Sequence, residues 1–378
     1  MTTLAVAAVS ARMLAEAAAL DGHEVVALDL FGDADTRRAS QRWWSIGVPG
    51  SLRIDPARVL EALRHTAQQP GDAVIGWVPG SGFEGQPDLL EAGAKLLPLI
   101  GTQPDAVRRV RDPLAFFAAL AAHGIAHPPV RDDAPAEPEG WLLKDARACG
   151  GWHIRRATAA HGTVGGSASL YFQREMPGVP MSATFIANGE RAMLLGINEL
   201  IVRPVGARPH VYGGCIGPVT VSADVAQRVG DAVRMLTAEF GLRGWCSLDF
   251  IRDEEAIGVL EVNPRPPASL SLYAQRGLID AQLRACLQGE LPRAGAFAAL
   301  QVAGSEIVYA RRSLTLDAIG AQHLAGRADA HDLPAAGAQF EAGDPICSVS
   351  ATGDTAGHVK ALLDAARDTL TKELETTR

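Results

Sequence analysis

The stretch Val259–Ser271, VLEVNPRPPASLS, begins as a buried strand and then places Glu261, Asn263 and Arg265 on alternate positions. Side chains two positions apart on a strand point to the same face of the sheet. A carboxylate, an amide and a guanidinium would therefore share one face, which is a poor surface for a hydrophobic core. The pattern predicts a strand that carries a functional site.

The segment before this strand predicts its hairpin partner. Trp245–Ile251 (WCSLDFI) reads as a strand, and the charged turn RDEE joins it to the opening stretch. The register expected around this turn places Asp249 opposite Leu260 or Glu261, with Cβ atoms about 5 Å apart. Two carboxylates and an amide oxygen on one face repel each other unless a hard cation lies among them. Magnesium prefers such oxygen ligands, so we expect Asp249, Glu261 and Asn263 to bind Mg²⁺ and, through it, phosphate.

Bulk composition narrows the class of protein. The chain has 378 residues, 47% of them hydrophobic, which is enough for several domains with buried cores. A net charge of −8 and a pI near 5.7 argue against nucleic acid as a partner. Five scattered cysteines without a C-x-x-C pair favour a reducing, cytoplasmic location. No run reaches the roughly 18 uncharged apolar residues that a membrane span needs, so no membrane partner is expected.

The first hundred residues predict an α/β domain. Strands are expected over Leu4–Ser10, Glu24–Leu30 and Asp72–Gly80, with a helix between the first two that ends at Gly22. No G-x-G-x-x-G follows the first strand, which argues against a dinucleotide-binding oxidoreductase.

Ligands of such open sheets lie beyond the carboxyl ends of the strands. Four polar side chains are candidates to face a substrate there, although surface loops are the default interpretation: Ser10, Arg12, Asp33 and Glu84. The acidic cluster Asp29–Asp35 (DLFGDAD) is expected to be a solvated loop.

Lys144 ends a short strand that begins at Trp141, and the glycine-rich stretch ACGGWHI follows it. A lysine supplies a point charge for an anion, and a glycine loop supplies backbone N–H donors. Taken alone, an ordinary β-hairpin with a surface lysine is the simpler interpretation.

Together these segments resemble the ATP-grasp superfamily, in particular its carboxylate–amine ligase and carboligase branch. GWCSLDFI…GVLEVNPRP is similar to the metal hairpin, WLLKDARACGGWHI to the lysine strand and glycine loop, and FQREMPGVPMSATFI to the segment that receives adenine. The resemblance implies an ATP-grasp fold of class α/β and α+β. It comprises a Rossmann-like α/β domain (1–100), an ATP-grasp domain (101–290, with a lid at about 128–178) and a small β-rich C-terminal domain with a terminal helix (291–378).

The resemblance also implies ATP and Mg²⁺, with Mn²⁺ as a substitute. Asp249, Glu261 and Asn263 would bind the metal. Lys144 and Arg265 would act in catalysis, Lys144 on the nucleotide phosphates and Arg265 by the γ-phosphate or the acyl-phosphate. The glycine lid and the adenine hinge would complete the nucleotide site with Cys149, Gly150, Gly151 and Trp152, and with Gln173, Arg174, Glu175 and Met176.

Two positions depart from the family pattern. Pro113 stands where many members carry a first nucleotide lysine, so that Arg109 or Arg111 replaces its charge or Lys144 acts alone. Pro180 lies near the position of a glutamate that commonly holds the ribose. The bicarbonate and biotin residues of biotin-dependent carboxylases are not found, which disfavours a carboxylase.

The implied reaction joins two small molecules, a carboxylate and an amine. ATP would activate the carboxylate as an acyl-phosphate, and the amine would then form an amide. The subgroup near tyramine–glutamate ligase suggests glutamate and one-carbon cofactor biosynthesis as a lead. A biotin-carboxylase-like carboligase and a catalytically silent nucleotide-binding protein remain alternatives. His153 and Tyr212 are further candidates for the site, and the amphipathic C-terminal helix is a packing element or the contact of a homodimer.

Overall fold

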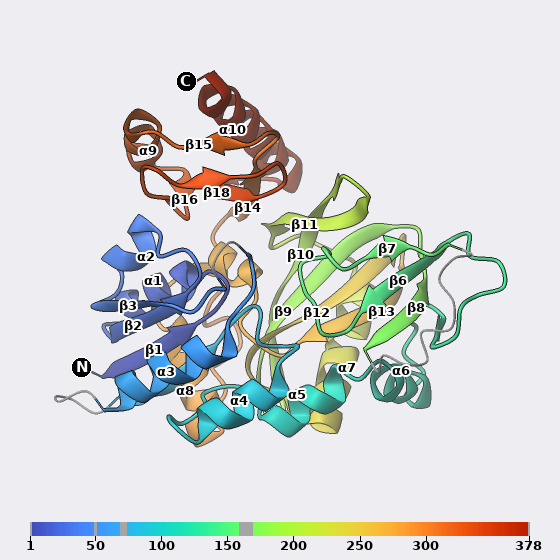
Figure 1. Cartoon of the computed structure of the whole chain (residues 1–378). Helices are drawn as coiled ribbons and strands as arrows, with labels where there is room; N and C mark the ends of the chain where they lie inside the picture. Colours follow the sequence, from blue (N-terminus) through green and yellow to red (C-terminus); the bar gives the residue numbers. More distant parts are fainter. Residues whose placement is uncertain (1, 49–50, 69–73, 159–168, 377–378) are drawn as a thin grey trace.

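The computed structural model describes residues 2–48, 51–68, 74–158 and 169–376. Asp72 and Ala73 at the start of a predicted strand, and residues 159–168 of the predicted lid, lie outside this range. Figure 1 shows an N-terminal α/β part, a large central sheet with a smaller sheet beside it, and a C-terminal part that packs above the first. No helix in the described part of the chain is long and apolar enough to cross a membrane.

The N-terminal part is a four-stranded parallel sheet of order β3-β2-β1-β4. Its first strand is buried along its whole length, as expected for a parallel strand covered on both faces. The predicted β-α-β unit is confirmed, with shorter strands than expected. The strands are β1 (Thr3–Ala7), β2 (Glu24–Asp29), β3 (Arg42–Ser45) and β4 (Val74–Pro79), and the helices are α1 (Arg12–Leu20), α2 (Ala34–Arg38), α3 (Pro56–Ala67) and α4 (Pro87–Ala94).

The expectation that Asp29–Asp35 forms a solvated loop is wrong. Asp29, Asp33 and Asp35 are 0%, 7% and 4% exposed. Asp29 is buried because it accepts hydrogen bonds from the N–H groups of Ala11 and Gly32 and from the indole of Trp43. Such charge-assisted bonds offset the loss of water around the carboxylate.

The central part is built on an eight-stranded sheet of order β13-β12-β9-β10-β11-β14-β18-β16. Helix α7 is capped at its start by Ser222, whose hydroxyl accepts from the N–H of Val225, and at its end by Gly241 in a left-handed conformation. Its apolar side packs into the same core as this sheet. The elements are β9 (Val179–Asn188), β10 (Ala192–Val205), β11 (Arg208–Gly217), α7 (Ala223–Phe240), β12 (Arg243–Asp253) and β13 (Ala256–Asn263).

A smaller four-stranded sheet of order β5-β8-β6-β7 lies beside the large one. The two helices before it separate at Asp112, whose carboxylate caps the second helix by accepting from the N–H of Ala115. The elements are α5 (Pro104–Val110), α6 (Pro113–Ala122), β5 (Val130–Arg131), β6 (Trp141–Asp145), β7 (Arg155–Arg156) and β8 (Leu170–Arg174).

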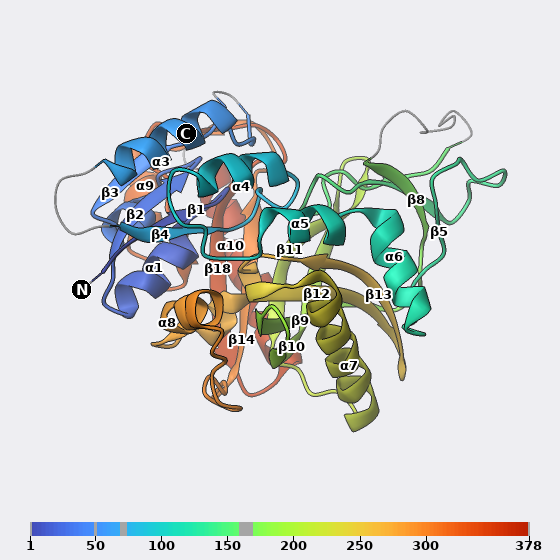
Figure 2. The same ribbon diagram turned by 90° about the horizontal axis from the view of Figure 1, so that it is seen from below.

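A helical connection joins the β12–β13 hairpin to the C-terminal part. It contains η1 (Ala268–Tyr273), α8 (Leu278–Leu283) and η2 (Arg284–Gln288). Figure 2 shows α8 beside α1, and the Asp21 carboxylate accepts hydrogen bonds from the N–H groups of Gly277, Ile279 and Asp280 at the start of α8. This contact ties the N-terminal part to the chain that follows the hairpin.

The C-terminal segment continues the large sheet. Strand β14 pairs with β11, and β18 and β16 follow it. The terminal helix covers these strands through a shared apolar core. The elements are β14 (Val302–Tyr309), β15 (Leu314–Thr315), α9 (Ala318–Ala325), β16 (Ala330–His331), β17 (Gln339–Phe340), β18 (Pro345–Gly353) and α10 (Ala356–Thr376).

Candidate active site

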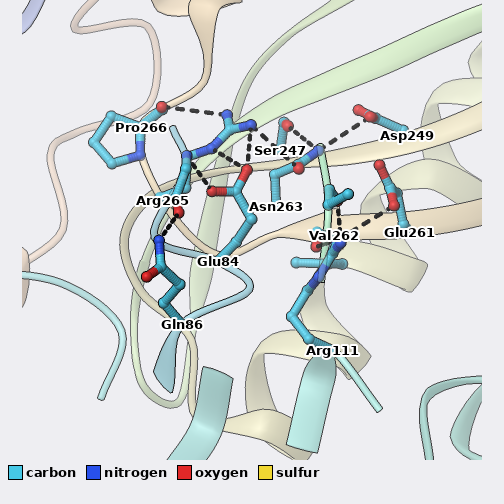
Figure 3. A network of polar contacts seen from close by, with 12 residues as sticks. Glu84, Gln86, Arg111, Ser247, Asp249, Glu261, Val262, Asn263, Arg265 and Pro266 are labelled. Carbon is cyan, nitrogen blue, oxygen red and sulfur yellow. Dashed lines mark hydrogen bonds and ion pairs between the residues drawn. The ribbon is translucent and has the colours of Figure 1, made fainter. Parts of the chain in front are cut away.

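The hairpin of β12 and β13 presents the three predicted metal ligands on one face. Asp249 pairs directly with Glu261, and Ser247 pairs with Asn263, so the predicted register is confirmed. Figure 3 shows Asp249, Glu261 and Asn263 close to one another, with Arg265 and Arg111 at opposite ends of the group. The alternation that decided this arrangement is visible in the sequence because it depends only on strand geometry.

The two carboxylates influence each other strongly. Burial and the neighbouring charge of Glu261 raise the pKa of Asp249. Burial would also raise the pKa of Glu261, but Arg111 and Lys144 outweigh it and hold that pKa well below its usual range. Arg111 Nη1 lies 3.2 Å from Glu261 Oε2. Glu261 therefore carries a firm negative charge, whereas Asp249 ionises less readily than an exposed aspartate.

This donor set fits a hard divalent cation. Two carboxylates and an amide are the oxygen ligands that Mg²⁺ takes from proteins when substrate phosphates and waters complete its shell. The Asn263 amide donates to Asp249 Oδ2 at 3.0 Å and accepts from Arg265 at 3.3 Å, so a metal would take over one of these contacts. Among the described residues, no three histidine, cysteine or carboxylate side chains gather into a metal site of their own.

Arg111 and Arg109 differ in their position relative to the site. Arg111 is buried and donates to the backbone carbonyls of Ala146 and Ala148 as well as to Glu261. Arg109 points away and donates to the carbonyl of Glu239. Of the two arginines considered in place of the first lysine, only Arg111 contacts a predicted site residue. It lies behind the cavity wall and ties the glycine loop to the hairpin.

Arg265 forms an ion pair with Glu84, which lies in the loop that follows β4. Its Nη2 atom lies 3.0 Å from Glu84 Oε1, and the Glu84 side chain is 1% exposed. The Arg265 charge lowers the pKa of Glu84 against the opposing effect of burial. The default expectation of a surface loop is therefore wrong for Glu84, because its carboxylate pairs with a residue of the metal hairpin (Figure 3).

Replacing this carboxylate should destabilise the folded protein. Glu84→Gln leaves the Arg265 guanidinium buried without its counter-ion, and breaking one side of a buried pair typically costs about 3 kcal/mol. We therefore expect the free energy of unfolding to fall by about this amount, which lowers the midpoint of urea unfolding. Glu91→Gln removes a carboxylate from an exposed pair with Arg108 and should change the midpoint little. Equal effects of the two substitutions would contradict a structural role for the Glu84–Arg265 pair.

Lys144 is 4% exposed and lies at the end of β6. Its Nζ atom donates to Gln173 Oε1 at 3.2 Å, from the neighbouring strand β8. The interpretation as a surface lysine is therefore wrong. The amide nitrogen of Gln173 is buried and has no hydrogen-bond partner within the described protein, as expected for a donor that awaits a ligand.

The glycine loop lies against β11. Gly150 and Gly151 both adopt positive φ angles, 68° and 76°. A Cβ atom at Gly151 would lie 1.8 Å from the carbonyl oxygen of His210, so only glycine fits this close approach. The carbonyl of Gly150 accepts from the N–H of Tyr212, and the Trp152 ring packs edge-on against Tyr309 of β14. The loop therefore covers the cavity from the small sheet to the C-terminal part.

The predicted hinge residues follow β8. Met176 packs so closely on Gly258 of β13 that a Cβ atom there would lie 2.4 Å from its sulfur. Glu175 accepts from His210 and Arg156. Arg174 donates to the carbonyl of Glu139 near the surface. These contacts connect the small sheet to the hairpin at the position predicted for adenine.

One cavity of about 1630 Å³ brings the predicted site together. Arg111 and His153 are not among the residues that line it. Every residue that the sequence predicted for the nucleotide, metal and catalytic sites does line it: Lys144, Cys149, Gly150, Gly151, Trp152, Gln173, Arg174, Glu175, Met176, Asp249, Glu261, Asn263 and Arg265. Tyr212, Pro180, Ser10, Arg12 and Asp33 line the same cavity.

Sequence reasoning missed the contribution of the C-terminal segment. Asp332 lines the cavity and lies 2.9 Å from Arg12 Nε of α1. It also accepts from the hydroxyls of Ser10 and Ser348. No local pattern marks Asp332, since its role depends on a contact with α1 some 320 positions earlier in the chain.

Burial, together with the charges of Asp332, Asp29 and Asp35, raises the pKa of Asp33 to about 8, against the opposing effect of Arg12. A carboxyl group with a raised pKa keeps a proton that the unfolded chain has lost, so it weakens stability as the pH rises from about 4 to about 8. Asp33→Asn has no such proton. We expect its melting temperature to exceed that of the wild type by a margin that grows across this window, measured by calorimetry. A constant margin would contradict the raised pKa.

Comparison with known proteins identifies this architecture. A parallel α/β part, a large antiparallel sheet and a smaller four-stranded sheet meet around one cavity. Residues 110–269 match the family model described as an ATP-grasp domain. The chain therefore carries an ATP-grasp domain.

Relatives support this assignment. The large chain of carbamoyl phosphate synthase from Deinococcus radiodurans is 26% identical over 197 residues, which are 47% of this chain. The match takes in 19% of that relative, so the chain spans about a fifth of the length of the curated relatives it matches.

Two solved structures have the same fold. The L-amino acid ligase from Bacillus licheniformis superposes with a TM-score of 0.70 at 14% identity, over 97% of each chain. The biotin carboxylase domain of the 2-oxoglutarate carboxylase from Hydrogenobacter thermophilus, in complex with MgADP, ADP and bicarbonate, superposes with a TM-score of 0.71 at 14% identity, over 99% of this chain and 94% of that one. At these identities the likeness shows the fold alone, and it extends over nearly the whole chain.

Proposed function

We propose that the protein is an ADP-forming ligase that activates a carboxylate as an acyl-phosphate and couples it to an amine. The observation that carries this proposal is the shared cavity, where a buried lysine, a pair of facing carboxylates and a buried arginine meet. Lys144 and Arg265 would bind phosphate, and the unpartnered amide of Gln173 would donate to the nucleotide. The L-amino acid ligase from Bacillus licheniformis has the same fold, and this likeness supports a ligase reaction for the present chain.

The proposed reaction has two steps. A substrate carboxylate oxygen attacks the γ-phosphorus of ATP, the bond between that phosphorus and the β,γ-bridging oxygen breaks, and ADP leaves. The amine nitrogen then attacks the acyl carbon, the carbon–oxygen bond to phosphate breaks, and inorganic phosphate leaves while the nitrogen loses a proton. A carboxylate is a poor acyl donor until it is phosphorylated, so the protein mainly orients the reactants and neutralises charge.

Each residue has a limited role in this scheme. Lys144 holds phosphate oxygens as a point charge, and Arg265 offers a planar pair of donors to the phosphate or the acyl-phosphate. Asp249, Glu261 and Asn263 would hold Mg²⁺, with Mn²⁺ as a substitute. The metal, when bound, would offset negative charge on the phosphates. A cytoplasmic location and a homodimer belong to the same proposal.

The first test is release of ADP and phosphate from Mg-ATP over a panel of carboxylates and amines. The panel includes glutamate with tyramine-like amines, as in one-carbon cofactor biosynthesis. ADP release that requires both an acid and an amine would support the ligase. ADP release with bicarbonate in place of the amine would indicate a carboligase instead. Binding of ATP without turnover on the whole panel would favour the silent nucleotide-binding alternative.

A further inference from the structure

The cavity extends well past the proposed nucleotide site. Its volume of about 1630 Å³ exceeds the roughly 300–1,000 Å³ of a typical small-molecule site. Its far wall is formed by the carboxyl ends of β1 and β2 and by the segment around β18. The residues there are Val9, Ser10, Arg12, Leu30, Phe31, Asp33, Ile54, Asp332 and Ile346.

Four carboxylates meet near this wall, and three of them have donors from the protein. Asp29 accepts from two backbone N–H groups and an indole. Asp35 accepts from the N–H groups of Asp332 and Leu333, at 2.7 and 3.1 Å. Asp332 accepts from Arg12 and from two serine hydroxyls. These groups are held by the fold and need no ligand.

Asp33 is the exception. It is 7% exposed, its side chain makes no hydrogen bond that caps the following helix, and it forms no ion pair with any residue of the described chain. The nearby Arg12 is already held by Asp332 at 2.9 Å and by Glu16 at 2.7 Å. A buried carboxylate without a partner is costly. Because Asp33 lines the cavity, a cationic group of a ligand can supply the missing partner.

The position of Asp33 separates it from the proposed reaction centre. Asp33 follows β2, whereas Glu84, which pairs with Arg265, follows β4. In the sheet order β3-β2-β1-β4 these strands are two places apart. Neighbouring strands lie about 4.8 Å apart, which separates the two sites by roughly 10 Å. Apolar side chains, among them Leu30, Phe31 and Ile54, line the cavity wall alongside Asp33.

We propose that Asp33 binds a second cationic nitrogen of the amine substrate, at the end remote from the acyl-phosphate. The inference rests on the proposed function and narrows the substrate class. The amine would be a diamine or a basic amino acid derivative whose apolar stem lies against Phe31 and Ile54 while its other nitrogen reacts near Arg265. A monoamine would leave Asp33 without a partner.

Direct binding tests this assignment. A series of α,ω-diaminoalkanes and the monoamines of the same chain length would be titrated calorimetrically into the full chain. We expect diamines of suitable length to bind about tenfold or more tightly than their monoamines, as for a charge-assisted hydrogen bond. Asp33→Asn should abolish this preference. Glu190→Gln, an exposed carboxylate in the β9–β10 turn, should keep it. No preference in the wild type, or a preference that survives in Asp33→Asn, would overturn the proposal.

Failure of this inference is distinguishable from failure of the ligase proposal. A second variant, Asp33→Ser, is prepared beside Asp33→Asn. Binding of a non-hydrolysable ATP analogue by each variant checks that it is folded. ADP release with diamines that is unchanged in both variants would leave the ligase standing and overturn the role of Asp33. A diamine preference that depends on Asp33, with no ADP release on any acid, would sustain the site and overturn the ligase.

Discussion

Glu261→Gln is expected to reduce ADP release by at least about 100-fold, the scale on which loss of one stabilising group in an active site is felt. Glu261 faces Asp249 across the hairpin and is the carboxylate whose negative charge Arg111 and Lys144 stabilise. Its amide replacement keeps the shape of the side chain and removes the charge that would hold the metal. The measurement is steady-state ADP release on the substrate pair that the panel identifies.

Two controls make this result interpretable. Glu254→Gln changes an exposed carboxylate in the turn of the same hairpin and should leave ADP release unchanged. Asp249→Asn should reproduce most of the loss, since the two carboxylates are expected to share one metal. A Glu261→Gln protein that melts like the wild type and releases ADP at the normal rate would refute the metal-binding role of the hairpin.

Lys144→Met is expected to weaken ATP binding by about 30-fold, equivalent to the roughly 2 kcal/mol of a hydrogen bond to a charged group. Lys144 is 4% exposed, and burial alone would lower its pKa, but the Tyr171 side-chain oxygen and the Glu261 carboxylate outweigh burial and raise that pKa. Methionine keeps most of the apolar stem and removes only the ammonium. Calorimetric titration with ATP measures the effect directly.

An exposed lysine provides the comparison. Lys360→Met on α10 should bind ATP with unchanged affinity. If Lys144→Met binds ATP as tightly as the wild type, the phosphates must depend on other cations, and Arg265 would be the next to replace. If the variant binds ATP weakly and also melts at a much lower temperature, Lys144 has a structural role through Gln173 that the ATP titration alone does not separate.

The interior of the site depends on contacts between distant parts of the chain. Glu84 and Arg265 are 181 positions apart, and Arg111 and Glu261 are 150 apart. Both pairs connect the metal hairpin to elements that precede it. Substitutions in these pairs should therefore alter stability as well as activity, whereas substitutions of Asp33 should alter substrate preference and the pH dependence of stability.

The hairpin and the βαβ unit could be predicted from local sequence patterns. Alternation with a period of two places Glu261 and Asn263 on one face. The RDEE turn sets Phe250 opposite Val259, and a register shift beyond that pair brings Asp249 opposite Glu261. The glycine loop could also be predicted, because Gly150 and Gly151 supply the positive φ angles that other residues avoid. These features depend on neighbours within a few residues.

Which polar side chains are buried, and which partners they have, follows from contacts between segments that are distant in the chain. Asp29 and Asp35 look solvated in sequence, yet backbone N–H groups from other segments surround them. Glu84 and Lys144 are of residue types that usually lie at the surface. In the fold Glu84 is buried against Arg265, and Lys144 is buried against Gln173. A charged side chain can be buried only where a partner is brought to it, and chain folding over hundreds of residues places that partner. Local sequence therefore predicts to which face of a strand a side chain points. The partners of a charged side chain depend on the whole fold.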